Sequence, residues 1–438
     1  MRHLSEVYAI GRLSFLCAAG ALGSVACSVA SDIGAVERSS SKATDVELVL
    51  STGVDQVTDW NQIAHANMAT ASGFAPQTRT LAIMHAAVFD AVNDIERDYA
   101  VYAVDLTAPT GSSPEAAAVA AAHKVLVTLI PASTAAFDAA RATSLAAIPD
   151  GQAKTDGIAH GVAVATAMLA LRSGDAVASV PFVPGSHAPG VFDVTGVNSQ
   201  WGDIAPFALH SVDQYVGDGP YALASAEYAV DFNEVKSLGR ATSTTRTADQ
   251  THAALWWVEN SNFTWNRVAR IAAAAHGNSL NENARLFALL NIAAADAIIT
   301  GFRTKYTYLS WRPIKAIARA DEDDNSATDA DPTWVPLATT PAHPDYVSNH
   351  AIYSAAAARV LADFFGDDFS FSTGSSSAVP AGTTRAFGSF SAAAAECGES
   401  RIWLGYHTRK AVTDGLKSGR QVGHFTFEHI AQVNHGHG

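Results

Sequence analysis

Alanine is the residue that most constrains how this chain can fold. It recurs in clusters, such as the AAAVAAA run at 116–122, and runs of β-branched residues are short. Alanine has the highest intrinsic helix propensity, so the α-helix is the favoured secondary structure. Apolar residues also recur at spacings of three and four, the pattern of one buried helix face, in the series Leu81, Met84, Val88, Val92 and Ile95.

Helix signals and helix breakers divide the chain into segments. Ser113, Pro114 and Glu115 combine a cap, a first-turn proline and a carboxylate, which predicts a helix that starts there and ends at Pro131. Further helices are predicted from Trp60 and at 133–148, 152–172, 247–259, 262–276, 281–309, 348–366, 384–396 and 400–433. The remaining patterns predict a long irregular segment at 173–243, an acidic loop at 320–345 and a hairpin or loop at 367–380.

The predicted fold is therefore all-α, with two packed helical bundles joined by long irregular connections. A chain of 438 residues can hold one large domain or two packed halves. We place the N-terminal helical half at 31–243 and the C-terminal helical half at 244–438.

The N-terminus has the pattern of a signal peptide over residues 1–30. Arg2 and Arg12 precede a run of small and apolar residues that offers two small-x-small cleavage sites. Cys27 offers a lipoprotein alternative, which is weaker because Ser24, not a Leu-like residue, stands three positions before it. The chain has three cysteines, two of them in this segment, so no disulfide framework is expected. We expect an exported protein, periplasmic or extracellular.

The charge balance limits the partners. A formal net charge of −14 argues against nucleic acid, because a phosphate backbone needs a basic face. No later apolar run is long enough to span a bilayer, so no stable membrane insertion is expected after cleavage. A homo-oligomer is left open. Because Lys and Arg are scarce, clusters of cations in the C-terminal half become more informative.

Three segments of the C-terminal half carry candidate chemistry. The first contains Lys305 and, seven residues later, Arg312 followed by Pro313. Seven residues make two helical turns, so we expect both cations on one helix face. The acidic stretch at 321–331 could also bind calcium, but it lacks the glycine and the final glutamate of an EF-hand loop, and a solvated loop is preferred.

The second segment runs from 341 to 350 and includes His343, Ser348, Asn349 and His350. Ser348 is placed as a helix N-cap, which would leave the first-turn N–H groups free beside His350. A helix N-terminus with free N–H groups is a natural anion site.

The third segment contains Ser400, Arg401 and, six residues after the arginine, His407. Each of these residues alone is most often a solvated cation, a packing histidine or a simple cap. Together, three cations, a hydroxyl, first-turn amides and two imidazoles suit an oxyanion that carries charge on several oxygens.

With the three segments in this order, the chain resembles the superfamily of type 2 phosphatidic acid phosphatases and vanadium haloperoxidases. The resemblance covers mainly residues 300–410, and looser similarity to bacterial vanadium-haloperoxidase-like proteins extends through the region of Arg79 to Tyr99. It implies an oxyanion pocket for vanadate or phosphate. Vanadate bound in trigonal-bipyramidal form resembles a phosphoryl-transfer transition state, so one pocket suits both.

The resemblance also implies a role for each residue. Lys305, Arg312 and Arg401 would hold the oxygens of the anion. Ser348 and the backbone amide of Asn349 would add hydrogen bonds. His407 would be the axial partner, either a vanadium ligand or the nucleophile of a phosphatase, and His350 would be the acid–base residue.

Two positions depart from the family pattern. Asn349 stands where the family usually has glycine, which adds bulk beside the anion and requires a backbone conformation that Asn tolerates. Ala411 stands four residues after His407, where the family often has Asp. Asp414 is too far along the chain to be assumed equivalent, so the orientation of His407 is less secure.

The preferred interpretation is a vanadium-dependent haloperoxidase that uses hydrogen peroxide, a halide and a small organic acceptor. The chain is much longer than a minimal phosphatase of the superfamily and lacks the several membrane spans of lipid phosphatases. His343, seven residues before His350, matches a second histidine of bromide- and iodide-using members, although a loop histidine without a role is nearly as plausible. The alternatives are an exported acid phosphatase that forms a phosphohistidine at His407, and a degenerate oxyanion-binding protein.

Overall fold

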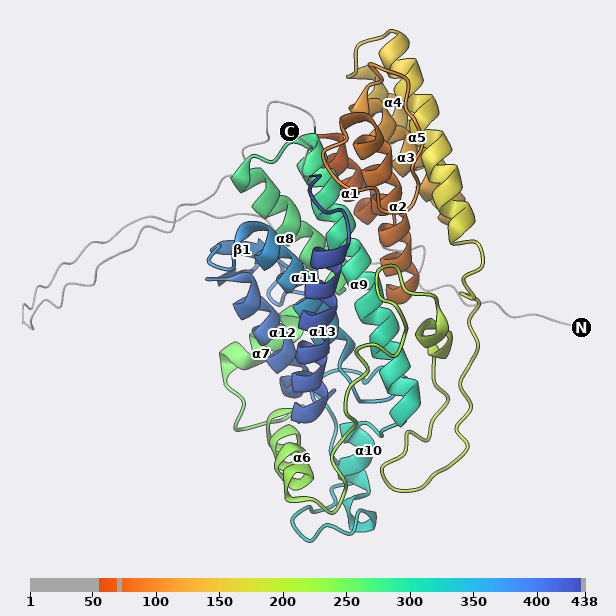
Figure 1. Cartoon of the computed structure of the whole chain (residues 1–438). Helices are drawn as coiled ribbons and strands as arrows, with labels where there is room; N and C mark the ends of the chain where they lie inside the picture. Colours follow the sequence, from red (N-terminus) through yellow and green to blue (C-terminus); the bar gives the residue numbers. More distant parts are fainter. Residues whose placement is uncertain (1–54, 69–72, 435–438) are drawn as a thin grey trace, which may run out of the picture. The chain divides into compact units, whose positions relative to one another are not determined.

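The computed structural model describes residues 55–68 and 73–434, and most of them are helical. In chain order the elements are α1 (Gln56–Met68), α2 (Phe74–Glu96), α3 (Pro114–Leu129), α4 (Thr134–Ala146), α5 (Gln152–Leu171), α6 (Ala226–Leu238), α7 (Ala248–Trp256), α8 (Ser261–His276), α9 (Leu280–Tyr308), α10 (Pro313–Ala318), α11 (Asn349–Phe365), β1 (Phe371–Gly374), β2 (Thr384–Phe387), α12 (Phe390–Trp403) and α13 (Arg409–His429) (Figure 1). The predicted all-α class is confirmed. The signal peptide, Cys27 and the last four residues lie outside the described residues.

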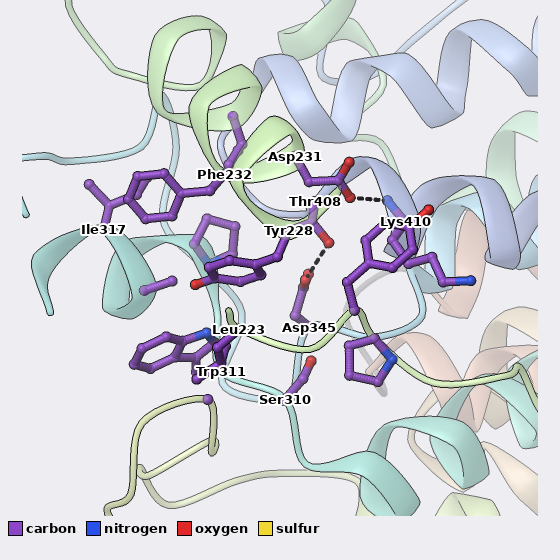
Figure 2. Close-up of a pocket in the computed structure, with 16 residues that line it drawn as sticks. Leu223, Tyr228, Asp231, Phe232, Ser310, Trp311, Ile317, Asp345, Thr408 and Lys410 are labelled. Atoms are coloured by element: carbon purple, nitrogen blue, oxygen red, sulfur yellow. Dashed lines mark hydrogen bonds between the residues drawn. The ribbon is translucent and has the colours of Figure 1, made fainter. Parts of the chain in front are cut away.

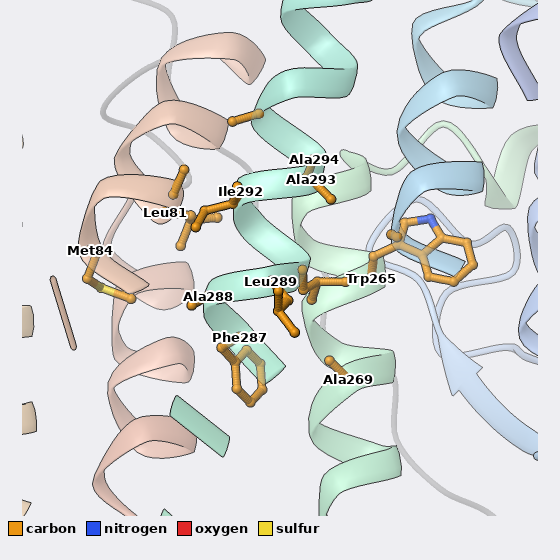
Figure 3. Packing of buried hydrophobic residues seen from close by; sticks show 14 of the residues in the cluster. Leu81, Met84, Trp265, Ala269, Phe287, Ala288, Leu289, Ile292, Ala293 and Ala294 are labelled. Atoms are coloured by element: carbon orange, nitrogen blue, oxygen red, sulfur yellow. The ribbon is translucent and has the colours of Figure 1, made fainter. Parts of the chain in front are cut away.

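Helix α9 lies in the centre of the hydrophobic core. It starts with a capping box between Ser279 and Glu282, and most of its residues are buried. Figure 3 shows it between α2, which contributes Leu81 and Met84, and α8, which contributes Trp265. Among the described residues, α9 alone is a single helix long and apolar enough to cross a bilayer, but its apolar stretch is wholly buried in the protein, as expected of a core helix.

Small residues let the helices of both halves approach closely. In the N-terminal half, a Cβ on Gly161 of α5 would lie 2.2 Å from the carbonyl oxygen of Ala117 on α3. In the C-terminal half, Gly415, Gly419 and Gly423 form a stripe on α13 against α11, and a Cβ on Gly419 would lie 2.2 Å from the Ile352 carbonyl oxygen. Any larger residue would push the helices apart. The stripe therefore fixes where α13, and the loop before it, meet the start of α11.

Two buried carboxylates hold irregular segments onto the helices. Asp296 of α9 accepts the backbone N–H groups of residues 207, 208 and 209 at 2.6–2.9 Å. Asp90 of α2 accepts those of residues 102, 103 and 104 at 2.8–3.0 Å. Both side chains are fully buried. The long 173–243 connection is thus anchored to the core by a charge on α9.

Three sequence predictions were wrong in detail. The 173–243 segment contains α6, whose Ser225 cap and buried Tyr228, Phe232 and Val235 have helical spacing, and the Pro and Gly around it obscured this signal. A continuous helix at 400–433 is replaced by α12 and α13, because Gly405 has a φ of 77° and the chain turns there. The helix expected at 384–396 begins as strand β2, which pairs antiparallel with β1.

Three carboxylates of the acidic loop have partners within the protein. Asp323 accepts the Thr328 hydroxyl at 2.9 Å, and Glu322 pairs with Arg319 at 2.5 Å. Asp331 forms an ion pair with Arg240. Across residues 55–68 and 73–434, no group of three or more His, Cys, Asp or Glu side chains is placed to hold a metal ion. The preference for a solvated loop over a calcium site stays a prediction.

Candidate active site

Lys305 is buried in the last turn of α9, with 0% of its surface exposed. Its Nζ donates to the carbonyl oxygens of Pro344 (2.7 Å) and Asp345 (2.9 Å), so the first segment is tied to the second. An ammonium group has three donors, which leaves one N–H beyond these two bonds. Burial, with the neighbouring Arg312, lowers the pKa of Lys305 well below its usual range.

Arg312 does not share a helix face with Lys305, contrary to the prediction. α9 ends where Leu309 takes a left-handed conformation, and Arg312 is the N-cap residue of α10, with Pro313 in the first helical position. Its guanidinium nevertheless turns into the same site. Nε donates to the His343 carbonyl oxygen at 2.6 Å, and Nη1 donates to another carbonyl at 2.8 Å and lies 3.1 Å from Nε2 of His407.

Ser348 is the N-cap of α11, as predicted. Its hydroxyl accepts the N–H of Ala351, and its own N–H donates to the Ala411 carbonyl at 2.9 Å. The first intrahelical bond runs from Ile352 to Ser348 at 3.0 Å, so the preceding first-turn amides have no acceptor within the helix. The site therefore has the helix N-terminus that an anion needs.

Asn349 is accommodated by a missing side chain on the facing helix. It is the first residue of α11 and has no positive φ, so it needs no left-handed conformation. A Cβ on Gly301 of α9 would lie 2.6 Å from the Asn349 Oδ1, so a side chain at 301 would require the Asn349 side chain to move. The Asn349 side chain, which the family pattern lacks, thus packs beside Gly301.

His350 lies at the same end of α11, with its ring stacked on Phe74 at a centroid distance of 6.3 Å. Its Nε2 is buried and has no hydrogen-bond partner among the described residues. Burial, then Arg401, lowers the pKa of His350 well below its usual range. The ring is therefore neutral, with one nitrogen available.

Arg401 and His407, six residues apart, come from different elements and do not share one helix face. Arg401 belongs to α12, and His407 lies in the loop before α13. Arg401, 1% exposed, donates through Nη2 to the Trp257 carbonyl oxygen at 2.6 Å, while its Nη1 is buried without a partner in the described part of the chain. His407 is 3% exposed, and burial followed by Arg312 and Lys305 lowers its pKa well below the usual range.

Asp345 is the residue that the sequence analysis missed. Its Oδ1 lies 2.6 Å from the His407 Nδ1, and its Oδ2 accepts the Thr408 hydroxyl at 3.0 Å. Burial raises the pKa of Asp345 to about 6, against the opposing fields of Arg312 and Lys305. Since His407 is held neutral, the contact is a hydrogen bond to a carboxylate and not an ion pair. Its signal in the sequence was a carboxylate within the 341–350 segment.

His343 is also part of the site. Its Nδ1 lies 2.9 Å from the Arg312 Nη2, and its ring meets Phe302 edge-on at a centroid distance of 5.6 Å. Burial, with Arg312, lowers the pKa of His343. The histidine therefore supports the guanidinium from the side opposite to its contact with His407.

The electrostatics of the site are unusual for a protein core. The three cations, Lys305, Arg312 and Arg401, are all at most 3% exposed. Within residues 55–68 and 73–434, no carboxylate forms an ion pair with any of them, and each donates to carbonyl oxygens instead. Buried charges normally have a direct partner of opposite charge. The structure brings all the predicted site residues together around an excess of positive charge.

Asp345 also lines a pocket. The pocket is half-open, most of its wall is aromatic and aliphatic, and its polar lining residues are Asp231, Ser310, Asp345, Thr408 and Lys410 (Figure 2). Tyr228 and Trp311 stand beside them in the wall. The carboxylate that contacts His407 therefore borders a mostly apolar pocket.

Comparisons with known proteins agree with this fold. Residues 285–436 match the family model described as the VCPO second helical-bundle domain. The chain is similar to the vanadium chloroperoxidase of Curvularia inaequalis, with 26% identity over 192 residues that cover 36% of this chain and 31% of that protein. The chain thus spans about a third of the length of this curated relative. The matched domain lies inside the predicted C-terminal half, and the boundary at 243 stays a prediction.

Solved structures extend the likeness to most of the chain. A bacterial vanadium-dependent iodoperoxidase is similar with a TM-score of 0.75 and 25% identity, over 86% of this chain and 97% of that one. The holo form of a bacterial vanadium-dependent chloroperoxidase shares the fold with a TM-score of 0.67 and 14% identity, over 86% and 95% of the two chains. The fold is thus that of solved vanadium haloperoxidases, and residues 285–436 match a domain of that superfamily, which confirms the resemblance seen in the sequence.

Proposed function

We propose that this chain is an exported vanadium-dependent haloperoxidase that oxidises a halide with hydrogen peroxide at a histidine-bound vanadate. The observation that carries the proposal is the set of three buried cations without paired carboxylates around His407. Its likeness to iodoperoxidase and chloroperoxidase structures supports peroxidase over phosphatase chemistry. The 1–30 segment supports export.

The residues present fit vanadate. A buried Arg401 Nη1 and a buried His350 Nε2 have no hydrogen-bond partner among the described residues, which is the state of groups that bind an added ligand. Lys305 has one spare donor, and the N-terminus of α11 adds backbone N–H groups. These donors match the several charged oxygens of an oxyanion.

Each residue then has one task. Lys305, Arg312 and Arg401 hold the oxygens, with Ser348 and the Asn349 amide. His407 binds through Nε2, and His350 moves protons through its free Nε2. Vanadate supplies a Lewis-acidic centre that activates hydrogen peroxide toward halide.

His343 belongs to the proposal as the residue that influences the choice of halide. It fixes one side of the Arg312 guanidinium and rests on Phe302, so a change there moves a cation of the pocket. We propose bromide or iodide as the halide and a small organic molecule as the acceptor of the oxidised halogen.

The test is peroxide-dependent halogenation of a phenol reporter by the purified protein, with and without orthovanadate, across iodide, bromide and chloride. We expect activity that depends on vanadate and falls by at least about 100-fold in His407→Ala. A phosphate-ester assay runs in parallel. Phosphate release that vanadate inhibits, without halogenation, would assign the phosphatase alternative, and binding without turnover in either assay would assign the degenerate one.

A further inference from the structure

Asp345 connects all three segments of the site. Its backbone N–H donates to the Ser310 carbonyl at 3.0 Å, and its backbone carbonyl accepts the Lys305 Nζ at 2.9 Å. Its side chain then contacts His407 and Thr408 of the third segment. The residue is only 3% exposed. Both its backbone and its carboxylate are therefore held in place by the site itself.

The helix that follows His407 provides no carboxylate for it. Ala411 has no polar side chain, is fully buried, and its carbonyl accepts the Ser348 N–H. Asp414 is committed elsewhere, because its Oδ2 lies 2.5 Å from the Tyr346 hydroxyl and 2.7 Å from the Lys410 Nζ. The chain therefore has no acidic residue at position 411, where the family pattern often has one. Asp345 instead reaches His407 from another segment.

We propose that Asp345 is the positioning residue of His407, and that it replaces the acid absent at position 411. This inference rests on the proposed function, in which His407 is the partner of the bound anion. A carboxylate only accepts hydrogen bonds, so the proton of the neutral ring sits on Nδ1. The Nε2 lone pair then faces Arg312 and the anion pocket. A ligating histidine commonly donates its other ring N–H to such an acceptor.

The surroundings of Asp345 suit this role. Thr408 donates to the carboxylate and also caps α13 by accepting the Ala411 N–H, so the carboxylate is linked to a helix N-terminus. Asp345 also lines the pocket in Figure 2, whose wall includes Tyr228 and Trp311. The residue is nevertheless 3% exposed, so little water competes for the carboxylate and a direct bond to the imidazole is favoured.

The experiment measures the ring directly, with no vanadate added. Protein labelled with ¹⁵N in its histidines is studied by NMR at mildly alkaline pH, and His407→Gln assigns the His407 signals. In the wild type we expect a protonated, strongly hydrogen-bonded Nδ1 and an unprotonated Nε2. Asp345→Ala and the isosteric Asp345→Asn should lose that signature, and Asp414→Asn, the matched control on α13, should keep it.

Vanadate binding by equilibrium dialysis is the second readout. We expect Asp345→Ala and Asp345→Asn to weaken vanadate binding by about 10–100-fold, and Asp414→Asn by less than about twofold. An unchanged His407 signal in a folded Asp345→Asn protein would overturn the inference, as would unchanged vanadate affinity. If the wild type bound no vanadate, the proposed function would fail, while the NMR result would still decide the role of Asp345.

Discussion

Two sets of buried charged residues in this protein are handled in opposite ways. Asp90 and Asp296 each accept three backbone N–H groups and hold loops onto the helices of the core. Lys305, Arg312 and Arg401 donate to a few carbonyl oxygens, and Arg401 retains a buried donor without a described partner. In this protein, these buried aspartates have all their hydrogen bonds made within the protein and stabilise the fold. We infer that the buried cations, which have donors to spare, bind a ligand.

The largest expected effect is on stability, from removing one of the two buried aspartates that hold loops. Asp296→Ala leaves three backbone N–H groups without their acceptor, so the free energy of unfolding should fall by about 3 kcal/mol or more, measured by urea denaturation. Asp296→Asn keeps one acceptor oxygen and should cost less. Vanadate affinity should be unchanged in folded protein, because Asp296 lies about 13 Å along α9 from Lys305. A stability like that of the wild type would contradict the structural role.

The next effect concerns the buried cations and is expected in vanadate binding. Arg401→Met removes a charged donor and should weaken vanadate binding by about 10–100-fold, since hydrogen bonds to charged groups contribute about 1.5–3 kcal/mol. Without anion, its melting temperature should differ little from that of the wild type, because a costly buried charge is lost along with its bonds. The control is Arg385→Met, which removes an arginine already paired with Asp249 and Glu396. Equal effects of both variants on binding would break the comparison.

Gly301→Ala should have an intermediate effect. The added Cβ meets the Asn349 Oδ1 at 2.6 Å and must displace the Asn349 side chain beside the anion site, at a cost of about 1–3 kcal/mol in unfolding free energy and with weaker vanadate binding. Asn349→Gly in the same chain removes the clash and should restore much of both. A double-mutant cycle measures this coupling, and strictly additive effects would show that the two positions do not meet.

The smallest effect is expected from Ser348→Ala. Loss of the N-cap hydroxyl of α11 should lower the free energy of unfolding by about 1 kcal/mol. Ser113→Ala removes the equivalent cap of α3 and should cost a similar amount. Only the Ser348 variant should also weaken vanadate binding, which separates the cap from the anion site in thermal melts with and without vanadate.

The sequence predicted what depends on local pattern. The Ser113 and Ser348 caps and the buried face of α2 followed from spacing and residue type. The eight candidate site residues came from the motifs that resemble the superfamily, and their roles stay a prediction. The continuity of elements did not follow, because the ends of α9 and α12 depend on a left-handed Leu309 and on Gly405, which the tertiary structure imposes. A helical spacing of seven was therefore misleading for Lys305 and Arg312.

Partnerships across segments were also beyond the sequence. Nothing in the local pattern pairs Asp345 with His407, 62 positions apart, or Gly301 with Asn349. Such contacts arise from packing, and here the glycine stripe of α13 sets the approach of the loop to α11. A departure from a motif, as at Ala411 and Asn349, therefore had to be judged against its three-dimensional neighbours.

The contact between Gly301 and Asn349 has an evolutionary consequence. With glycine at 349, position 301 could carry either a small side chain or none, but asparagine at 349 keeps its present side-chain position only beside Gly301. Glycine at 301 is therefore expected to come before asparagine at 349. Once asparagine is present at 349, a return to a side chain at 301 is disfavoured. Among relatives, asparagine at 349 should be inherited together with glycine at 301.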